Sequence, residues 1–177
     1  MRLEEDVKIA DFSQKKAKKP QIDHTEYHRE SKSGNLEKAD ALGNKLATAL
    51  IENIDRFAYA VDADNSEIMM QRGTLLAFAA TIGMEENIES SVLLDAAKIS
   101  FNKTIEKEKN DLYRHIIESG AFSFYYLAYR RGSEVERRIG QTFAMLCSHD
   151  GDSVFQELGE ALYCWFLSKT EKMIKQG

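Results

Sequence analysis

The sequence predicts an all-α protein, a single-domain bundle of about six helices preceded by a polar N-terminal arm. The 177 residues include one proline and ten glycines, too few for the many tight turns of a β-sandwich or barrel. Long stretches are rich in Ala, Leu, Glu, Lys, Met and Gln, which favour helix. Apolar residues recur at spacings of three and four, and a hydrophobic fraction of 43% is enough to build a core.

The chain divides by composition into two parts. Residues 1–33 are expected to form a basic and polar flexible arm, and residues 34–177 the helical bundle domain. The arm contains the basic run QKKAKKP, which ends in the only proline. Three apolar residues of the arm, Val7, Ile9 and Phe12, are compatible with a docked segment or a short helical turn.

Three helices are expected in the first half of the bundle domain. The first runs from about Leu36 to Val61, because apolar residues form one stripe along it. The second begins at Ser66, a good N-cap residue, and ends near Gly83, which suits a helix C-terminus. The third begins near Asn87 and ends in a strongly charged segment.

The stretch Leu112–Arg131 is expected to lie at the centre of the bundle, because its apolar residues point to nearly every side of a helix. Its first turns are polar, and its aromatic residues fill the second half. Neither glycine nor proline separates it from the preceding helix. Residues 87–131 therefore form either two helices, with a break at Asn110 or Asp111, or one long bent helix, and we favour the break.

Two further helices follow, each introduced by a clear signal. Gly132 ends the central helix, and Ser133 with Glu136 forms the S-x-x-E pattern of a capping box. Ser153 with Gln156 forms a second such box, which begins the last helix. That helix is expected to run almost to the end of the chain.

Five glycines fall inside predicted helices, where glycine costs roughly 0.5–1 kcal/mol relative to alanine. They are Gly43, Gly73, Gly120, Gly140 and Gly159. Close helix crossings explain them, since a missing side chain lets a neighbouring helix approach. Space for a ligand is the alternative, and we favour the crossings.

Charge and cysteine content exclude several classes of function. The net charge is −5, and residues 1–35 contribute +1, so the bundle is acidic. Nucleic-acid binding is therefore disfavoured except through the basic arm. No run of eighteen apolar residues suggests a membrane span, and the N-terminus lacks the pattern of a secretory signal. Cys147 and Cys164 are expected to be buried free thiols in a reducing, cytoplasmic setting, and a disulfide between them is the less favoured alternative.

No cofactor or metal is expected. Phosphate-binding loops, dinucleotide fingerprints, nucleophile elbows and di-iron motifs do not occur in the sequence. His24 and His28 have the spacing of a zinc pair, but a third ligand is not evident. Asp62 and Asp64 resemble the start of a calcium loop, yet the required glycine and glutamate are misplaced.

The weak catalytic candidates are Asp111, His115 and Glu118, which would share one face of a helix. A carboxylate beside an imidazole can set its tautomer and raise its basicity, as in a general base. The same spacing also describes an ordinary polar helix end. We favour that structural interpretation, and the sequence leans against an enzyme.

Two weak binding sites are also predicted. A small-molecule pocket would lie beside the central helix and be lined by Tyr125, Tyr126, Tyr129, Arg130 and Trp165. An anion site would lie at a helix N-terminus flanked by arginines, at Arg131, Ser133 and Arg137.

The sequence thus favours a cytoplasmic interaction or regulatory protein with a protein partner or a homo-oligomeric state. A helical bundle that binds a small molecule is the alternative, and an enzyme is less favoured. No family resemblance carries any of these expectations.

Overall fold

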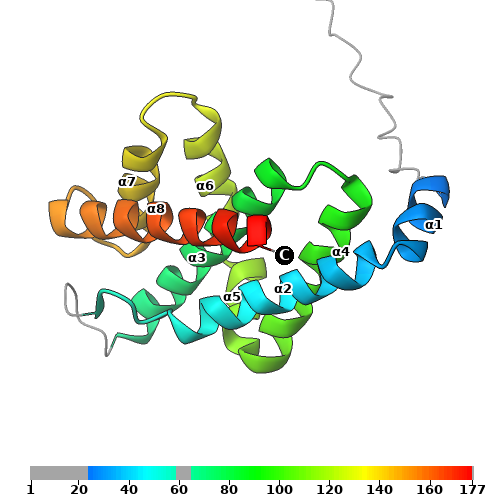
Figure 1. The fold of residues 1–177 in the computed structure, drawn as a ribbon. Helices are drawn as coiled ribbons and strands as arrows, with labels where there is room; N and C mark the ends of the chain where they lie inside the picture. Colours follow the sequence, from blue (N-terminus) through cyan, green and yellow to red (C-terminus); the bar gives the residue numbers. More distant parts are fainter. Residues whose placement is uncertain (1–23, 59–64, 177) are drawn as a thin grey trace, which may run out of the picture.

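The computed structural model describes residues 24–58 and 65–176, and within them the protein is all-α, as predicted (Figure 1). These residues form eight helices rather than about six: α1 (His24–Lys32), α2 (Asn35–Glu52), α3 (Ser66–Asn87), α4 (Ser91–Glu108), α5 (Asn110–Glu118), α6 (Ala121–Arg130), α7 (Val135–Leu146) and α8 (Ser153–Gln176). The apolar cluster of the arm, the basic run QKKAKKP, Val61 and the acidic pair Asp62 and Asp64 lie outside the described residues.

Helix α3 forms the centre of the molecule. Every residue from Gln71 to Met84 is buried, and α8 crosses α3 as its most extensive partner (Figure 1). The segment from Gly73 to Met84 has no charged side chain, and seven of its residues are Gly, Ala or Thr. Small side chains allow neighbouring helices to approach from several sides, so this uncharged segment can be enclosed completely.

The expectation that Leu112–Arg131 is the central helix is wrong. The stretch is divided into α5 and α6 by Gly120, whose φ of +70° is a left-handed conformation that glycine adopts without strain. Ile117 is 61% exposed and Leu127 is 60% exposed. Apolar residues occur on all sides of α5 and α6 because one side of each helix is buried and the other side exposes apolar residues.

The break after the third predicted helix is confirmed, because α4 ends at Glu108 and α5 begins at Asn110. Other predicted boundaries shift. The second predicted helix, α3, continues beyond Gly83 to Asn87, and its N-cap is Asn65, whose Oδ1 accepts from the backbone N–H groups of Glu67 and Ile68.

Neither predicted capping box forms. At the start of α8 the carboxylate of Asp152 accepts the N–H of Val154 at 2.8 Å, one residue earlier than the predicted cap. Asp152 is the better acceptor because its carboxylate carries a charge. The Ser133 hydroxyl accepts from Arg138 instead of capping α7, since the intervening Glu134 has a φ of +49°.

The interpretation of helical glycines as close crossings is confirmed at four positions. A Cβ atom at Gly43 would lie 2.2 Å from the carbonyl oxygen of Ala97, and one at Gly140 would lie 2.3 Å from that of Gln156. Gly73 and Gly159 are also in close contact, with side chains from other parts of the fold. Gly120 is the exception, because it lies between two helices rather than inside one.

The first predicted helix, α2, ends at Glu52, well before Val61. The turn after it is held by Arg72, a fully buried side chain of α3 that donates through Nε to the carbonyl of Ile54 at 3.0 Å and through Nη2 to that of Arg56. Burial lowers the pKa of Arg72, and the nearby Asp55 acts in the opposite direction.

Part of the predicted flexible arm is helical. Helix α1 packs against α2 and α4, and the Glu30 carboxylate accepts from Asn35 Nδ2 at 2.7 Å and from Arg29 Nε at 3.0 Å. These two hydrogen bonds lower the pKa of Glu30.

Cys147 is buried as predicted, whereas Cys164 is exposed, and both are free thiols. Among the described residues, no helix is both long and apolar enough to cross a membrane.

Candidate functional site

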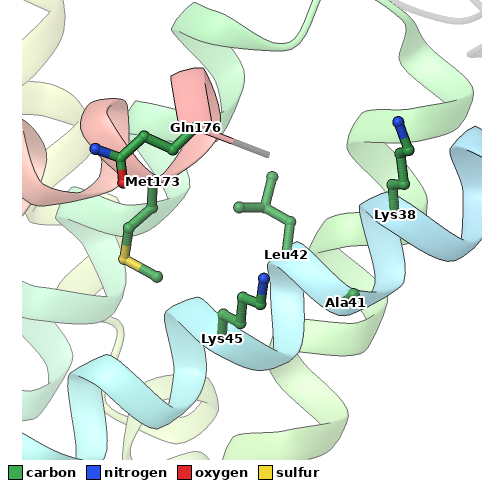
Figure 2. A pocket seen from close by; sticks show the side chains of 6 residues that line it. All are labelled: Lys38, Ala41, Leu42, Lys45, Met173 and Gln176. Atoms are coloured by element: carbon green, nitrogen blue, oxygen red, sulfur yellow. The ribbon is translucent and has the colours of Figure 1, made fainter.

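A surface groove between α2 and the C-terminal half of α8 combines lysines with half-buried apolar side chains (Figure 2). It consists of three adjoining hollows of about 380, 420 and 310 Å³. Its lining residues come from three helices and one helix junction. They are Asn35, Lys38, Ala39, Ala41, Leu42, Lys45, Ile88, Leu93, Trp165, Ser168, Lys169, Lys172, Met173, Ile174 and Gln176. We call this surface the lysine groove.

The periodicity of the two helices brings the lysines to this surface. Lys38 and Lys45 are seven residues apart on α2, so both lie on the same side as Leu42. The opposite side of α2 carries the buried residues Gly43 and Ala47. Figure 2 shows Leu42 and Lys45 extending from α2 toward α8, while Met173 extends from α8 toward α2.

The α8 side of the groove is organised around Trp165, the only tryptophan in the chain. Lys169 Nζ lies 5.8 Å from the centroid of this ring, and Arg56 Cζ lies 4.4 Å from it. Both distances are within the range of cation–π attraction. Lys172 is one turn further along α8, near the C-terminal end, where the helix dipole favours positive charge.

The groove is a local positive region on an acidic protein. Four lysines line it, and no lining residue is acidic. Within the described part of the chain, none of these lysines forms an ion pair, whereas Lys98 pairs with Glu85 at 2.5 Å and Arg114 with Asp111 at 2.7 Å. Unpaired lysines beside half-buried apolar side chains can bind a ligand that is both acidic and apolar.

The three catalytic candidates do not form a catalytic arrangement. Asp111 pairs with Arg114, and Glu118 is exposed at the end of α5. The Nε2 atom of His115 is buried and has no hydrogen-bond partner within residues 24–58 and 65–176, and burial lowers the pKa of this imidazole. Among the described residues no carboxylate is hydrogen-bonded to this imidazole, so it lacks the partner that the general-base hypothesis requires.

The predicted pocket residues are divided between two places. The three tyrosines of α6 surround Phe78 of α3, with ring centroids 5.3 Å away for Tyr125, 5.1 Å for Tyr126 and 6.5 Å for Tyr129. Phe122 and Tyr163 pack on the same ring, so aromatic side chains take up the space beside it. Trp165 instead packs against Phe57 and lines the lysine groove.

The rim of this aromatic cluster is polar. The Tyr126 hydroxyl donates to Glu85 Oε1 at 3.1 Å, and the Tyr129 hydroxyl donates to Glu86 Oε1. Burial raises the pKa of Tyr126 to about 12, and the hydrogen bond to Glu86 raises the pKa of Tyr129 to about 12. Arg130, another predicted pocket residue, lies over the Tyr126 ring at 5.7 Å.

The predicted anion-site residues point to different partners. Arg137 pairs with Glu134 at 3.3 Å, while Ser133 accepts from Arg138. Arg131 lines a separate hollow of about 390 Å³ between α6 and α7, together with the acidic Asp150. No cluster of three metal-binding side chains occurs in the described ranges, which include His24 and His28.

Sequence reasoning missed the lysine groove. The spacing of Lys38 and Lys45 around Leu42 is a usable signal for an exposed basic side of α2. The helix dipole is a sufficient local explanation for the lysines of α8, so they give no separate signal. The pairing of these two helices, which are more than a hundred residues apart in the sequence, has no counterpart in any local pattern.

Comparisons of the chain with models of protein families, with characterised proteins and with solved structures give no match. Inferences about function therefore rest on the geometry of the groove.

Proposed function

We propose that this chain is a cytoplasmic interaction module whose lysine groove binds an acidic, amphipathic segment of a partner protein. The observation that carries the proposal is the juxtaposition of four unpaired lysines with an apolar floor on a protein of net charge −5. An amphipathic segment laid in such a groove places its apolar side on Leu42 and Met173 and its carboxylates beside the lysines.

The apolar floor favours a protein segment over a nucleic acid. A phosphate backbone would engage the lysines, but it offers no apolar surface to Leu42, Leu93 or Met173. Stacking of bases would need a free aromatic face, and the only aromatic ring of the groove, Trp165, already has Arg56 and Lys169 beside it. The charge pattern also favours rapid, salt-dependent association with an acidic partner.

The proposal is tested by binding of a synthetic acidic peptide to the full chain, followed by fluorescence anisotropy. The probe is a labelled peptide of about 15 residues with leucines at helical spacing and glutamates between them. We expect binding that weakens between about 0.05 M and about 0.5 M salt, because exposed charges are screened.

Matched variants locate the binding surface. The triple variant K38Q/K45Q/K172Q removes three exposed lysines of the groove, and K103Q/K107Q/K109Q removes three exposed lysines of α4 and its end. We expect about tenfold weaker binding for the first variant, since each exposed charge pair contributes roughly 0.2–1 kcal/mol, and little change for the second. Equal weakening by both, or tighter binding of an oligonucleotide through the same lysines, would contradict the proposal.

A further inference from the structure

We propose that residues 3–12 of this chain, LEEDVKIADF, dock on the lysine groove of the same molecule and compete with its partner. The inference rests on the proposed binding function and adds its regulation. The segment has four carboxylates and one lysine, a net charge of −3. These charges are interspersed with Leu3, Val7, Ile9 and Phe12. It therefore has the chemistry that the groove would recognise, acidic groups for the lysines and apolar side chains for the floor.

The start of the described chain lies at the edge of the groove. Glu26, in the first turn of α1, accepts a hydrogen bond from Ser90 Oγ at 2.7 Å. Two groove-lining residues, Ile88 and Leu93, lie two positions before and three positions after Ser90. The N-terminal end of α1 thus lies beside residues that line the groove, and α1 is on the side of the molecule away from α6 and α7 (Figure 1).

The position of α1 is fixed at its other end as well. The carboxylate of Glu30 accepts from Nδ2 of Asn35, the first residue of α2, and only 7% of Glu30 is exposed. Asn35 itself lines the groove. Contacts at both ends of α1 therefore hold His24, the first described residue, close to the basic surface.

The connecting chain is long enough. The chain from Phe12 to His24 has twelve residue-to-residue steps and can span up to about 40 Å when extended. The part of α2 from Lys38 to Lys45 measures only about 10 Å along the helix axis, and the part of α8 from Trp165 to Gln176 about 17 Å.

Covalent attachment would make this docking effective even if the contact itself is weak. A segment held by a short connection has an effective concentration of order millimolar at its site. A partner must then displace the segment. The observed affinity for the partner is therefore the affinity of the open groove multiplied by the fraction of molecules in which the groove is open. Neutralising the acidic residues of the segment should open the groove.

The test uses the full chain and its single tryptophan, Trp165, which lines the groove. The variant E4Q/E5Q/D6N removes three negative charges from the segment, and the control K15Q/K16Q/K18Q removes three positive charges from the connection. We expect quenching of Trp165 fluorescence by acrylamide to rise about twofold in the first variant at every protein concentration, because docked side chains shield the ring. The control should quench like the unmodified chain.

Binding of the acidic peptide probe provides the second measurement. We expect E4Q/E5Q/D6N to bind the probe about three- to tenfold more tightly than the unmodified chain, with the control unchanged. Probe binding through the groove lysines with no effect of E4Q/E5Q/D6N on affinity or quenching overturns the docking while leaving the proposed function intact. A quenching response without any probe binding supports the docking and contradicts the function. Quenching that depends on protein concentration overturns intramolecular docking, since the segment would then occupy a second copy.

Discussion

Helices α3 and α6 are both rich in apolar residues, but they have opposite roles in the fold. Fourteen consecutive residues of α3, from Gln71 to Met84, are buried, whereas only Ala121, Tyr125 and Ala128 of α6 are buried. Aromatic content is higher in α6, and the uncharged run of small side chains belongs to α3. Burial on all sides thus follows from small, uncharged residues that admit several neighbours, rather than from large apolar ones.

The aromatic rings of α6 explain its intermediate position. Tyr125, Tyr126 and Tyr129 meet Phe78 on one side, and Phe124 and Leu127 remain exposed on the other. Helix α6 therefore covers one end of the core, and α3 forms the core itself.

The largest expected difference between the two helices is in the cost of removing a phenylalanine. We expect Phe78→Ala in α3 to lower the free energy of unfolding by about 3–5 kcal/mol, because it leaves a cavity among five aromatic rings. Phe124→Ala in α6, where the side chain is 48% exposed, should cost about 0.5 kcal/mol. Urea unfolding followed by circular dichroism measures both.

The variant Phe78→Leu is the control in case Phe78→Ala does not fold. Phe78→Leu should keep the helical spectrum and cost less than Phe78→Ala, since it leaves a smaller cavity. Equal costs for Phe78→Ala and Phe124→Ala would show that α6 carries as much of the core as α3.

A smaller effect is expected at the polar rim where the two helices meet. The pKa values of Tyr126 and Tyr129, raised to about 12 in the fold, lie above the value near 10 of an unfolded tyrosine. The folded state therefore holds these protons more tightly. The resulting stabilisation is fully present below about pH 10 and is lost as the pH rises through about 12.

The measurement compares urea midpoints at about pH 9 and about pH 11.5 for the unmodified chain and for Y126F/Y129F. We expect the unmodified chain to lose more stability between these pH values, because the variant has no hydroxyls to titrate at the rim. Identical losses would mean that the hydrogen bonds to Glu85 and Glu86 do not hold the tyrosine protons.

Some local features of the structure follow correctly from local patterns in the sequence. The all-α class, the helix break before Asn110 and the close crossings at Gly43 and Gly140 follow from composition, charge and missing side chains. The prediction of the central helix fails because aromatic content is a weaker guide to burial than the uncharged run of α3. The cap at Asp152 escapes prediction because the serine pattern beside it matches a capping box more fully.

The candidate site could not be predicted from local sequence patterns, for a different reason. The lysine groove exists only because α8 crosses α3 and reaches α2, which places Met173 opposite Leu42. Neither helix has a motif that specifies this crossing. Conversely, helical spacing selects Asp111, His115 and Glu118, and the fold gives Asp111 a different partner, Arg114.

Two hollows of the molecular surface that are lined partly by apolar side chains make the groove hypothesis directly testable. One is the lysine groove, and the other is the hollow between α6 and α7 that includes Phe124, Leu127 and Asp150. The most direct measurement is nuclear magnetic resonance of the ¹⁵N-labelled full chain during titration with the acidic peptide. We predict amide shift changes concentrated at Lys38, Lys45 and their neighbours on α2 and α8, whereas changes concentrated at Phe124 and Leu127 would contradict binding in the groove.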